Sequence, residues 1–365
     1  MSGVDLLEVL GRTLPVVVFL LTITVVAEVA DASGVFDVAG HAAARVAGHR
    51  VLALWLLLAG LAVLVTAFLS LDTTAVLLTP VALTVARQLG VPAAPFALTT
   101  LFLANTASLF LPVANLTNLL ALARFEELGA DHSDVIALAL APGCAAVAGT
   151  LLVGWLVHRR DLRGSFVRAA PTGGHDPLLL RLSGTVCLAI GPLFALGITP
   201  WAVSAAAAGG LVLATRLRAP HLLRTVSPPW GMALAVTALF VVIQVALDLG
   251  GESVLGALVG EGDGAGDLAR VAAVGAVTSN GVNNLPAFIA LESVAGDSPQ
   301  RLMALLVGTN VAPVVTPWGS LATLLWLHRV RAAGLPIRLR EVAAQGLAVA
   351  LVAGGGAVLA LTLVA

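Results

Sequence analysis

Charged residues are scarce in this chain, at 11% of its 365 residues, whereas a soluble domain carries about 25%. Lysine and tyrosine are absent, so every fixed cation is an arginine. With 59% apolar residues, the chain has too little polar surface to coat a globule that faces water. The longest polar stretch, residues 158–177, leaves no room for a large soluble domain. The composition therefore predicts a membrane protein.

Features that would indicate an enzyme or a metal protein are also missing. Cys144 and Cys187 both lie inside apolar runs without a CxxC or metal-ligand spacing, so they are expected to be small buried hydrophobes. The histidines fall at predicted interfaces or loops, and no metal or cofactor is expected. There is no HExxH, GxSxG or Walker loop. A formal net charge of −1 argues against nucleic acid as a partner.

What the chain does have is a series of long apolar runs. Several approach the roughly 20 residues that a helix needs to span a bilayer. Two shorter apolar pieces, at 75–88 and 285–291, fit re-entrant hairpins better than full spans. The expected fold is all-α, with about eight crossings, two such hairpins and two broken helices. The expected elements are spans at 13–30, 134–157, 178–196, 201–215, 232–248 and 342–364, an interfacial helix at 35–48, hairpins at 52–88 and 268–291, and broken helices at 95–122 and 302–328.

The arginines indicate how these elements are oriented. If the basic loop after residue 157 lies in the cytoplasm, nearly all arginines fall inside, as the positive-inside rule requires. The acidic segments 126–131 and 261–267 and both chain termini then lie outside. The arginines left outside are Arg12, Arg124, Arg270 and Arg301. This topology places the protein in the plasma or inner membrane as a multi-pass protein.

The two broken helices repeat one another in sequence. Asn105 pairs with Asn310 and Pro112 with Pro317 at one offset, since 310 − 105 = 205 and 317 − 112 = 205. In the expected topology the two copies run in opposite directions. Inverted repeats with broken helices and a midplane site are typical of secondary transporters. We expect repeat one at 1–160, the basic loop at 161–177 and repeat two at 178–365, with breaks at Pro112, Pro313, Pro317 and Gly319.

Polar residues at the tips and breaks are the candidate substrate or ion ligands. Asp72 is the only carboxylate between Asp37 and Glu126, and a charge near the membrane midplane costs about 2.5–3.5 kcal/mol, so Asp72 is expected to carry the coupling ion. It could also cap the helix that follows it. Glu28 and Asp31, near a span end, are expected to reach only the interface. The remaining candidates are Thr73, Thr74, Asn105, Thr106, Ser108, Asn115, Thr117, Asn118, Ser279, Asn280, Asn283, Asn284, Asn310, Thr316, Ser320 and Thr323.

Several strings resemble the arsenical pump membrane subunit (ArsB-type) family of the ion-transporter superfamily. The stretch from Thr316 to His328, TPWGSLATLLWLH, is very similar to that family's TPxGSLATLLWLH, and Asn283-Asn284-Leu-Pro286 is similar to its NNxP. Asp72 to Pro80 is similar to its DGAALxLTP, Thr106 to Asn118 to its TASLxxxxxNLxN, and Asp31-Ala-Ser-Gly34 to its DxSG. The resemblance covers nearly the whole chain.

That resemblance implies efflux of arsenite and antimonite coupled to inward proton movement, sometimes with a soluble ATPase subunit as partner. It also implies two hairpins that meet two broken helices at a central site where Asp72, Asn105, Asn283, Asn284 and Asn310 converge. The chain departs from the family in three respects. Two further N-terminal spans are expected in members, Asn105 and Asn310 stand where members carry Asp, and Val315 replaces a Lys.

Two other functions fit the same residues. A Na⁺-coupled anion carrier or Na⁺/H⁺ antiporter would use Asn105, Asn310 and nearby carbonyls for Na⁺, although few arginines lie near the midplane to hold an anion. A channel or a non-transporting membrane scaffold would also tolerate broken helices.

Overall fold

The computed structural model describes residues 3–167, 176–196, 198–228, 230–231, 233–234, 238, 252–296 and 298–364. The described chain is helical, and its only strand-like feature is an isolated bridge between Arg50 and Ser165. The first half contains α1 (Gly3–Ala32), α2 (Val35–Val46), α3 (Val51–Phe68), α4 (Leu71–Thr73), η1 (Thr74–Leu78), α5 (Thr79–Gln88), α6 (Ala93–Thr106), η2 (Ala107–Leu109), η3 (Pro112–Ala114), α7 (Leu116–Glu127) and α8 (His132–His158).

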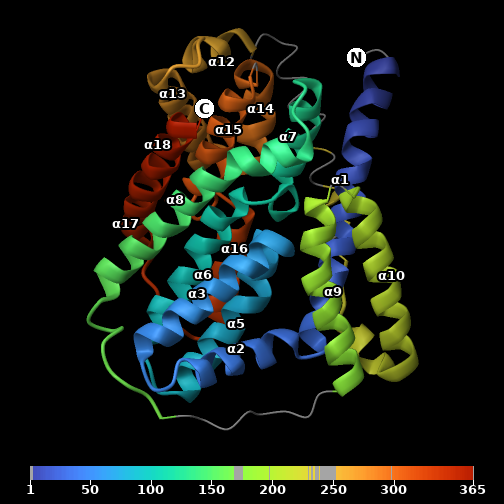
Figure 1. Ribbon diagram of the computed structural model, residues 1–365, viewed down its shortest axis with the longest axis vertical. Helices are drawn as coiled ribbons and strands as arrows, with labels where there is room; N and C mark the ends of the chain where they lie inside the picture. The colour runs from blue at the N-terminus through green and yellow to red at the C-terminus, as the bar shows by residue number, and fades with distance from the viewer. Residues whose placement is uncertain are drawn as a thin grey trace.

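The second half contains α9 (Pro177–Ala195), α10 (Pro200–Arg218), η4 (Pro220–Arg224), α12 (Glu252–Val259), α13 (Ala265–Val282), α14 (Asn284–Ala295), α15 (Pro299–Leu306), η6 (Val307–Val311), α16 (Leu321–Ala332), α17 (Leu339–Val349), η7 (Ala350–Gly354) and α18 (Gly355–Val364). Figure 1 shows α1, α9 and α10 side by side at one flank of the molecule. Hydroxyl contacts join them, because Thr22 Oγ1 lies 2.7 Å from Ser204 Oγ and Ser183 Oγ donates to Ser33 Oγ at 3.1 Å.

Four helical stretches among the described residues are long and apolar enough to cross a bilayer. They are Val51–Phe68, His132–His158, Pro177–Phe194 and Leu339–Val364, with mean hydropathies of 1.6 to 2.6. A fifth candidate is the bent pair Val17–Ala32 and Val35–Val46, with 58° between the two parts. The expected span at 232–248 lies almost wholly outside the described residues. The predicted total of about eight crossings therefore stays a prediction.

Each predicted hairpin turns at a residue with positive φ. Ser70 follows α3 with φ of 143°, and Asn283 follows α13 with φ of 104°. They are the only non-glycine residues of the described chain with positive φ, a conformation that is costly for residues with a Cβ atom. Both side chains cap the helix that follows, since Ser70 Oγ accepts from the Thr73 amide at 3.2 Å and Asn283 Oδ1 from the Leu285 amide at 3.3 Å. Capping helps to offset the strain.

The two broken helices stop and resume at matching positions. The first stops at Thr106 and resumes at Leu116, and the second stops at Val311 and resumes at Leu321. Both ends keep the offset found in the sequence, since 311 − 106 = 205 and 321 − 116 = 205. In Figure 1, α6 and α16 lie lower in the molecule and α7 and α15 higher, so the two helices run in opposite directions. This arrangement supports the predicted inversion, while the repeat boundaries stay a prediction.

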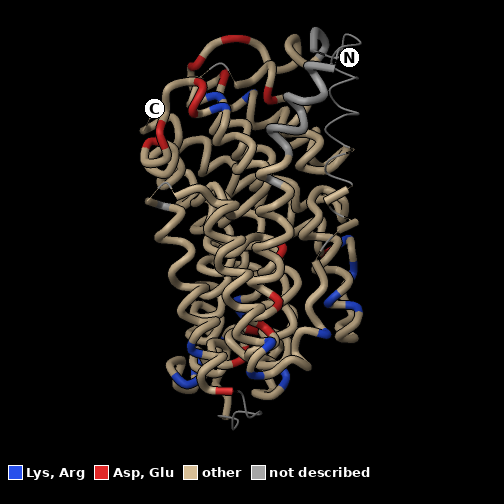
Figure 2. The backbone as a smooth tube through the Cα atoms, turned by 90° about the vertical axis from the view of Figure 1, so that its right-hand side faces the viewer, with Lys and Arg blue, Asp and Glu red and all other residues tan. Residues whose placement is uncertain are grey.

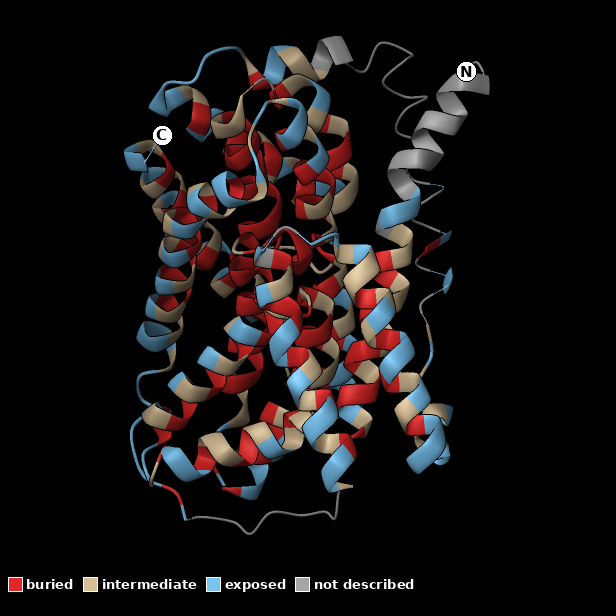
Figure 3. Ribbon diagram, turned by 45° about the vertical axis from the view of Figure 1, so that its right-hand side comes forward, coloured by how far each residue is buried: buried red, intermediate tan, exposed pale blue. Residues whose placement is uncertain are grey.

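Apolar side chains cover much of the outer surface. Figure 3 shows buried residues concentrated along the centre of the bundle and exposed ones on its outer helices. Leu188, Leu217 and Leu363 are exposed by 70% or more, as residues that face lipid are expected to be. Cys144 belongs to the same group. Its predicted burial is wrong, because this side of α8 is exposed, whereas Cys187 is buried as predicted.

Arginines gather towards one end of the long axis, whereas carboxylates occur in both halves. Figure 2 shows blue positions mainly at the lower end and a cluster of red positions at the upper end. The chain has no lysine, so the blue positions are arginines. This asymmetry matches the expected distribution of Arg between the two sides of a membrane. We refer below to the lower end as the arginine-rich end.

Candidate functional site

Asn310, at the end of the first half of the second broken helix, is the centre of a buried polar cluster. Its Oδ1 accepts hydrogen bonds from Asn115 Nδ2 at 3.1 Å and Thr117 Oγ1 at 2.7 Å. Its Nδ2 donates to Asn118 Oδ1 at 2.5 Å. All four side chains are almost fully buried. Since three of them come from the start of α7 in the other repeat, the two breaks are bonded directly to each other.

This amide cluster extends into the first break. Asn118 Nδ2 donates to the carbonyls of Ser108 and Leu111 at 2.6 and 3.0 Å, and Ser108 Oγ donates to the Asn105 carbonyl at 2.7 Å. These bonds satisfy carbonyls that the broken helix leaves without helical partners. The cluster consists of amides and hydroxyls, so it offers both donors and acceptors but carries no charge.

Two buried polar atoms near the breaks have no protein partner. They are Asn105 Oδ1 and Ser279 Oγ, and both residues are fully buried. Asn105 Nδ2 is satisfied within its own helix by the Leu101 carbonyl at 3.1 Å. A buried acceptor without a partner costs about 1–3 kcal/mol. Asn105 and Asn310 are equivalent in sequence but differ in structure, because only Asn310 bonds across to the other repeat.

The tip of the second hairpin is fastened to the second break. Asn280 Nδ2 donates to the Ala312 carbonyl at 2.9 Å, and Asn280 Oδ1 accepts from the amides of Val315 and Thr316 at 3.2 and 3.0 Å. Asn283 Nδ2 donates to the Trp318 carbonyl at 2.9 Å. The backbone N–H of Asn284 donates to the Gly319 carbonyl at 2.8 Å. Proline and glycine prevent a helix in the second break. These hydrogen bonds from the hairpin therefore hold the break in place.

The hydroxyls of the remaining candidates cap or bridge helices. Ser320 Oγ accepts from the Thr323 amide at 3.2 Å and caps α16, as Asn115 caps α7 at the equivalent position, since 320 − 115 = 205. Thr106 Oγ1 accepts from Thr150 at 3.0 Å. Thr74 Oγ1 lies 2.7 Å from Thr66 Oγ1. These contacts give each of these hydroxyls a hydrogen-bond partner within the protein, without a need for a bound solute.

Asp72 lies in the first turn after the first hairpin tip and lines a large cavity. This cavity has a volume of about 480 Å³ and lies between α1, the hairpin tip, the residue pairs 227–228 and 230–231, and α16. Asp72 Oδ1 has no partner within the protein. The cavity lining also includes Thr24, Ala27, Glu28, Thr73, Val76, Leu77, Ser227, Pro228, Trp230, Gly231, Leu325, His328 and Arg329.

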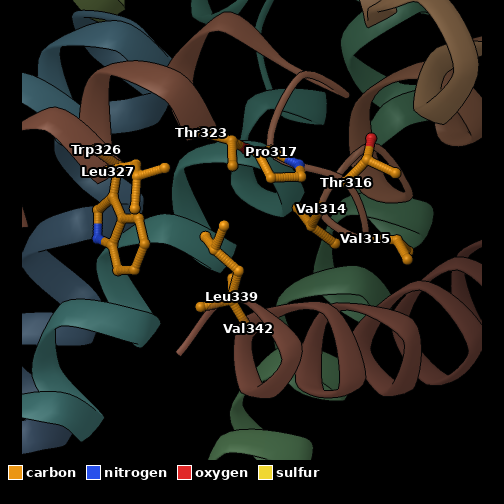
Figure 4. Close-up of a pocket in the computed structure, with 9 residues that line it drawn as sticks. All are labelled: Val314, Val315, Thr316, Pro317, Thr323, Trp326, Leu327, Leu339 and Val342. Atoms are coloured by element: carbon orange, nitrogen blue, oxygen red, sulfur yellow. The ribbon is translucent and has the colours of Figure 1, made fainter. Parts of the chain in front are cut away.

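A second pocket, beside the second break, is much smaller. Figure 4 shows Val314, Val315, Thr316 and Pro317 on one side, with side chains of α16 and α17 around them. Its volume is about 10 Å³, which is room for about one water molecule. In this conformation the pocket is therefore too small for a solute.

The predicted site residues form three groups rather than one. Asn310 meets Asn115, Thr117 and Asn118 in the amide cluster. Asn280, Asn283 and Asn284 bond to the second break, while Asp72 and Thr73 line the large cavity. No direct bond given by the structure links Asp72 or Asn105 to Asn310. The expectation that these groups form a single central site stays a prediction.

Sequence reasoning missed part of the cavity lining. Glu28 and Asp31 were expected only to reach the interface, but Glu28 is half-buried and lines the cavity. His328 and Arg329, at the end of a recognisable motif, were read as loop or interface residues and line it too. The available signal was the helical spacing that puts Leu325, His328 and Arg329 on one face of α16. Among the described residues no group of three His, Cys, Asp or Glu is placed to hold a metal ion.

Comparison with known proteins decides the family. The citrate transporter (CitMHS) family matches residues 9–296, which is more than half of the chain. The chain belongs to the citrate transporter family. Membership places it among multi-pass inner-membrane transporters of small ions or solutes, as its apolar helices indicate.

Two arsenical pump membrane proteins confirm the resemblance that the motifs of this chain indicate. The arsenical pump membrane protein of Yersinia enterocolitica is 29% identical over 335 residues, covering 84% of this chain and 76% of the relative. The arsenical pump membrane protein of Escherichia coli K12 is 26% identical over the same shares. The crystal structure of the Alcanivorax borkumensis YdaH transporter, described as having an unusual topology, aligns over 100% of this chain and 89% of its own. Its TM-score of 0.59 at 16% identity shows a shared fold.

Proposed function

We propose that this transporter exports arsenite or antimonite across the inner membrane in exchange for protons. The observation that carries the proposal is a neutral amide cluster between the two breaks, together with a carboxylate at the first hairpin tip, Asp72, that lines a cavity. Trivalent arsenite near neutral pH is an uncharged trihydroxide. Amides and hydroxyls can donate to and accept from such a solute without a charge. The names of the two bacterial arsenical pump relatives support this choice.

In this proposal Asp72 takes up and releases the coupling proton. Its Oδ1 is buried without a partner among the described residues, and the residue lines the cavity. Binding a proton would remove the cost of burying this unpaired charge. Asn310 and its partners hold the two breaks together at the point where the solute passes. The proton gradient then supplies the free energy for transport, because proton binding at Asp72 is coupled to movement of the solute.

The test is resistance in a host that lacks its own arsenite exporter. Expression should raise tolerance to arsenite, and Asp72→Asn should abolish the gain because the amide cannot carry the proton. Asp161→Asn is the matched control, since Asp161 lies on the basic loop 3.5 Å from His158 and outside the cavity. A membrane-inserted protein without any gain in tolerance contradicts the proposal.

The family description favours a second candidate, a carrier for a carboxylate anion such as citrate. For this candidate we propose Na⁺ as the coupling ion. It predicts Na⁺-dependent citrate uptake in proteoliposomes. Transport of arsenite that is saturable, driven by a pH gradient and indifferent to Na⁺ would contradict this candidate, and would also contradict a channel or a scaffold.

A further inference from the structure

Two of the candidate membrane spans end at one corner of the arginine-rich end. The span of α3 begins at Val51, and the span of α8 ends at His158. The loop that follows α8 lies at the lower end of the molecule in Figure 1 and returns to the start of α3. There Ser165 forms a bridge with Arg50, and the backbone N–H of Val51 donates to the Gly164 carbonyl at 3.3 Å. The two helix ends and the loop therefore form one surface.

Buried apolar side chains anchor this loop to the helices. Leu162 and Phe166 are only 3% and 5% exposed, and they belong to an apolar cluster that also contains Leu54 and Trp55 of α3. The backbone N–H of Phe166 donates to the His49 carbonyl at 2.9 Å, and the centroids of the two rings lie 6.5 Å apart. The exposed residues of the loop are thus held in place by packing, unlike those of a free chain.

Four exposed arginines gather on this surface. They are Arg50, Arg159, Arg160 and Arg163, and we refer to them as the arginine corner. Arg50 directly precedes the α3 span, and Arg159 directly follows the α8 span. Among the described residues no carboxylate forms an ion pair with any of the four. Asp161, the carboxylate of this loop, lies 3.5 Å from His158 instead. The corner therefore carries positive charge that the described part of the protein does not neutralise.

Exposed apolar side chains lie next to these arginines. Trp155, Leu156 and Val157, in the turn of α8 that precedes Arg159, are between 41% and 49% exposed, and Val46 at the end of α2 is 74% exposed. Tryptophan is enriched at the level of the lipid headgroups, and arginine at a helix end extends its charge to that level. The combination indicates a surface at the boundary between the acyl chains and the headgroups.

We propose that the arginine corner is a binding site for the headgroup of an anionic phospholipid. The phosphate of such a lipid accepts hydrogen bonds from guanidinium groups in bidentate geometry, which a neutral amide or a water shell does not match. Its acyl chains would cover Trp155 and Val46, which are exposed beside the arginines. An acidic soluble protein could pair with the arginines but could not cover apolar side chains at the depth of the bilayer. The site does not line the 480 Å³ cavity and does not depend on which solute is transported.

The experiment measures which lipid lies beside the corner. Cys144 and Cys187 are changed to Ala, and Ser165→Cys, at an exposed position bridged to Arg50, carries a fluorophore that is quenched only at short range. Full-length protein is placed in phosphatidylcholine vesicles. These contain the same small fraction of either spin-labelled phosphatidylglycerol or spin-labelled phosphatidylcholine. The ratio of the two quenching efficiencies reports the enrichment of the anionic lipid at the corner.

Phosphatidylglycerol should be enriched about tenfold, because each arginine near the membrane surface attracts anionic lipid. Sodium chloride at about 1 M should weaken the preference, since the Debye length falls to about 3 Å. Replacement of all four arginines of the corner by Gln should bring the ratio near one. The matched control replaces four other exposed arginines by Gln, which gives the same change in charge on the same expected side of the membrane, and should keep most of the preference. These are Arg216, Arg224, Arg331 and Arg340.

A ratio near one in the parent overturns the inference. An equal loss in the two quadruple variants overturns it as well, since only the charge of the whole end would then matter. Ser133→Cys, at the opposite end of α8 beside the acidic cap, is the control reporter and should show no preference for phosphatidylglycerol. An equal preference there also contradicts a localised site.

Native mass spectrometry provides a second measurement that needs no label. The parent protein with both cysteines in place is released from detergent in an equal mixture of phosphatidylglycerol and phosphatidylcholine. It should retain phosphatidylglycerol preferentially, and the variant without the four arginines of the corner should not. Retention of both lipids in equal number by the parent contradicts the proposed site.

Discussion

Asn310 joins the two repeats through a single side chain. Its amide satisfies groups on Asn115, Thr117 and Asn118 at once, all in a space from which water is excluded. The neutral cluster also differs from the carboxylates that the family resemblance implies at this position. An amide needs no counter-ion and no proton to be buried, whereas a carboxylate needs one or the other.

Replacing this amide should destabilise the fold substantially. Asn310→Ala leaves at least two of its partners without a bond, and each unsatisfied buried group costs about 1–3 kcal/mol. We expect a loss of at least about 2 kcal/mol in the free energy of unfolding, measured by thermal or denaturant unfolding in detergent. Gln300→Ala, a partly buried amide on the helix that leads to Asn310, is the control and should cost less than half as much. Equal losses would argue against a joining role.

For single residues, the sequence predicts which ones are polar but not which partners they form hydrogen bonds with. The offset of 205 makes Asn105 and Asn310 equivalent. In the structure Asn310 has three side-chain partners from α7, whereas Asn105 keeps an unpaired oxygen. At the equivalent positions in the second break, Ser320 and Thr323 of the α16 start bond to each other. Local propensities cannot reveal such a choice of partner, since it depends on how two distant elements pack.

The helices themselves were predictable except where caps decide their ends. The first hairpin was expected to resume at residue 75, but its helix begins at Leu71, because Ser70 caps it and brings Asp72 into the first turn. The second hairpin was expected to break over residues 278–284, yet α13 continues through Val282. Asn280 fits inside that helix because its side chain bonds the Ala276 carbonyl one turn earlier.

Close packing between α17 and the second break makes a helix glycine necessary. A Cβ atom at Gly346 would lie 2.0 Å from the Val314 carbonyl oxygen. Helix propensity alone favours Ala by about 1 kcal/mol, but the overpacking cost of about 1–3 kcal/mol should exceed it. We expect Gly346→Ala to lower the melting temperature and reduce transport. Gly355→Ala, further along the same helical stretch with open space around it, should be neutral or stabilising.

The start of α9 provides a pH test outside the membrane. Asp176 caps α9 and pairs with Arg218 of α10, and these contacts with the Leu179 amide and Arg218 lower the pKa of its carboxyl group below the usual 3.8. A lowered pKa means that the stabilisation is present above pH 3.8 and is lost as the pH falls through the folded-state value.

Asp176→Asn keeps a side-chain oxygen for the cap but removes the charge. Its melting temperature should lie slightly below that of the parent at neutral pH, and the two should converge in acid, at a pH below about 4. Melting in detergent across this range provides the measurement. A difference that persists unchanged in acid would show that the charge is not its source.

For the whole molecule, the arginine asymmetry predicts which side each loop faces. In a background without Cys144 and Cys187, a cysteine at Ser165 should react with membrane-impermeant thiol reagents only from the cytoplasmic side. A cysteine at Ser133, beside the capped start of α8, should react only from the opposite side. The assay compares intact cells with inverted vesicles. Reaction of both positions from one side would contradict the topology.

Composition and arginine placement anticipate the membrane class, the helices and the breaks, since each depends on residues close together in the chain. The large cavity could not be anticipated in this way. Its walls come from α1, from a segment that contains Ser227 and Trp230, and from α16, and about 90 residues or more of sequence separate each from the next. Only the packing of α1 beside the rest of the bundle places Glu28 and Arg329 in the lining of one cavity.

The first hairpin ends partway through the molecule, and the cavity reaches Asp72 beside that tip. We expect the cavity to open to the arginine-rich end, so that water in it holds the electrical potential of that side. The transmembrane voltage then falls mainly across the protein between Asp72 and the opposite surface, where one charge gains about 2.3 kcal/mol per 100 mV. A proton arriving at Asp72 from that surface crosses most of the field, whereas its release into the cavity crosses little. The membrane potential should therefore drive the protonation of Asp72, whereas its deprotonation should depend on the pH difference.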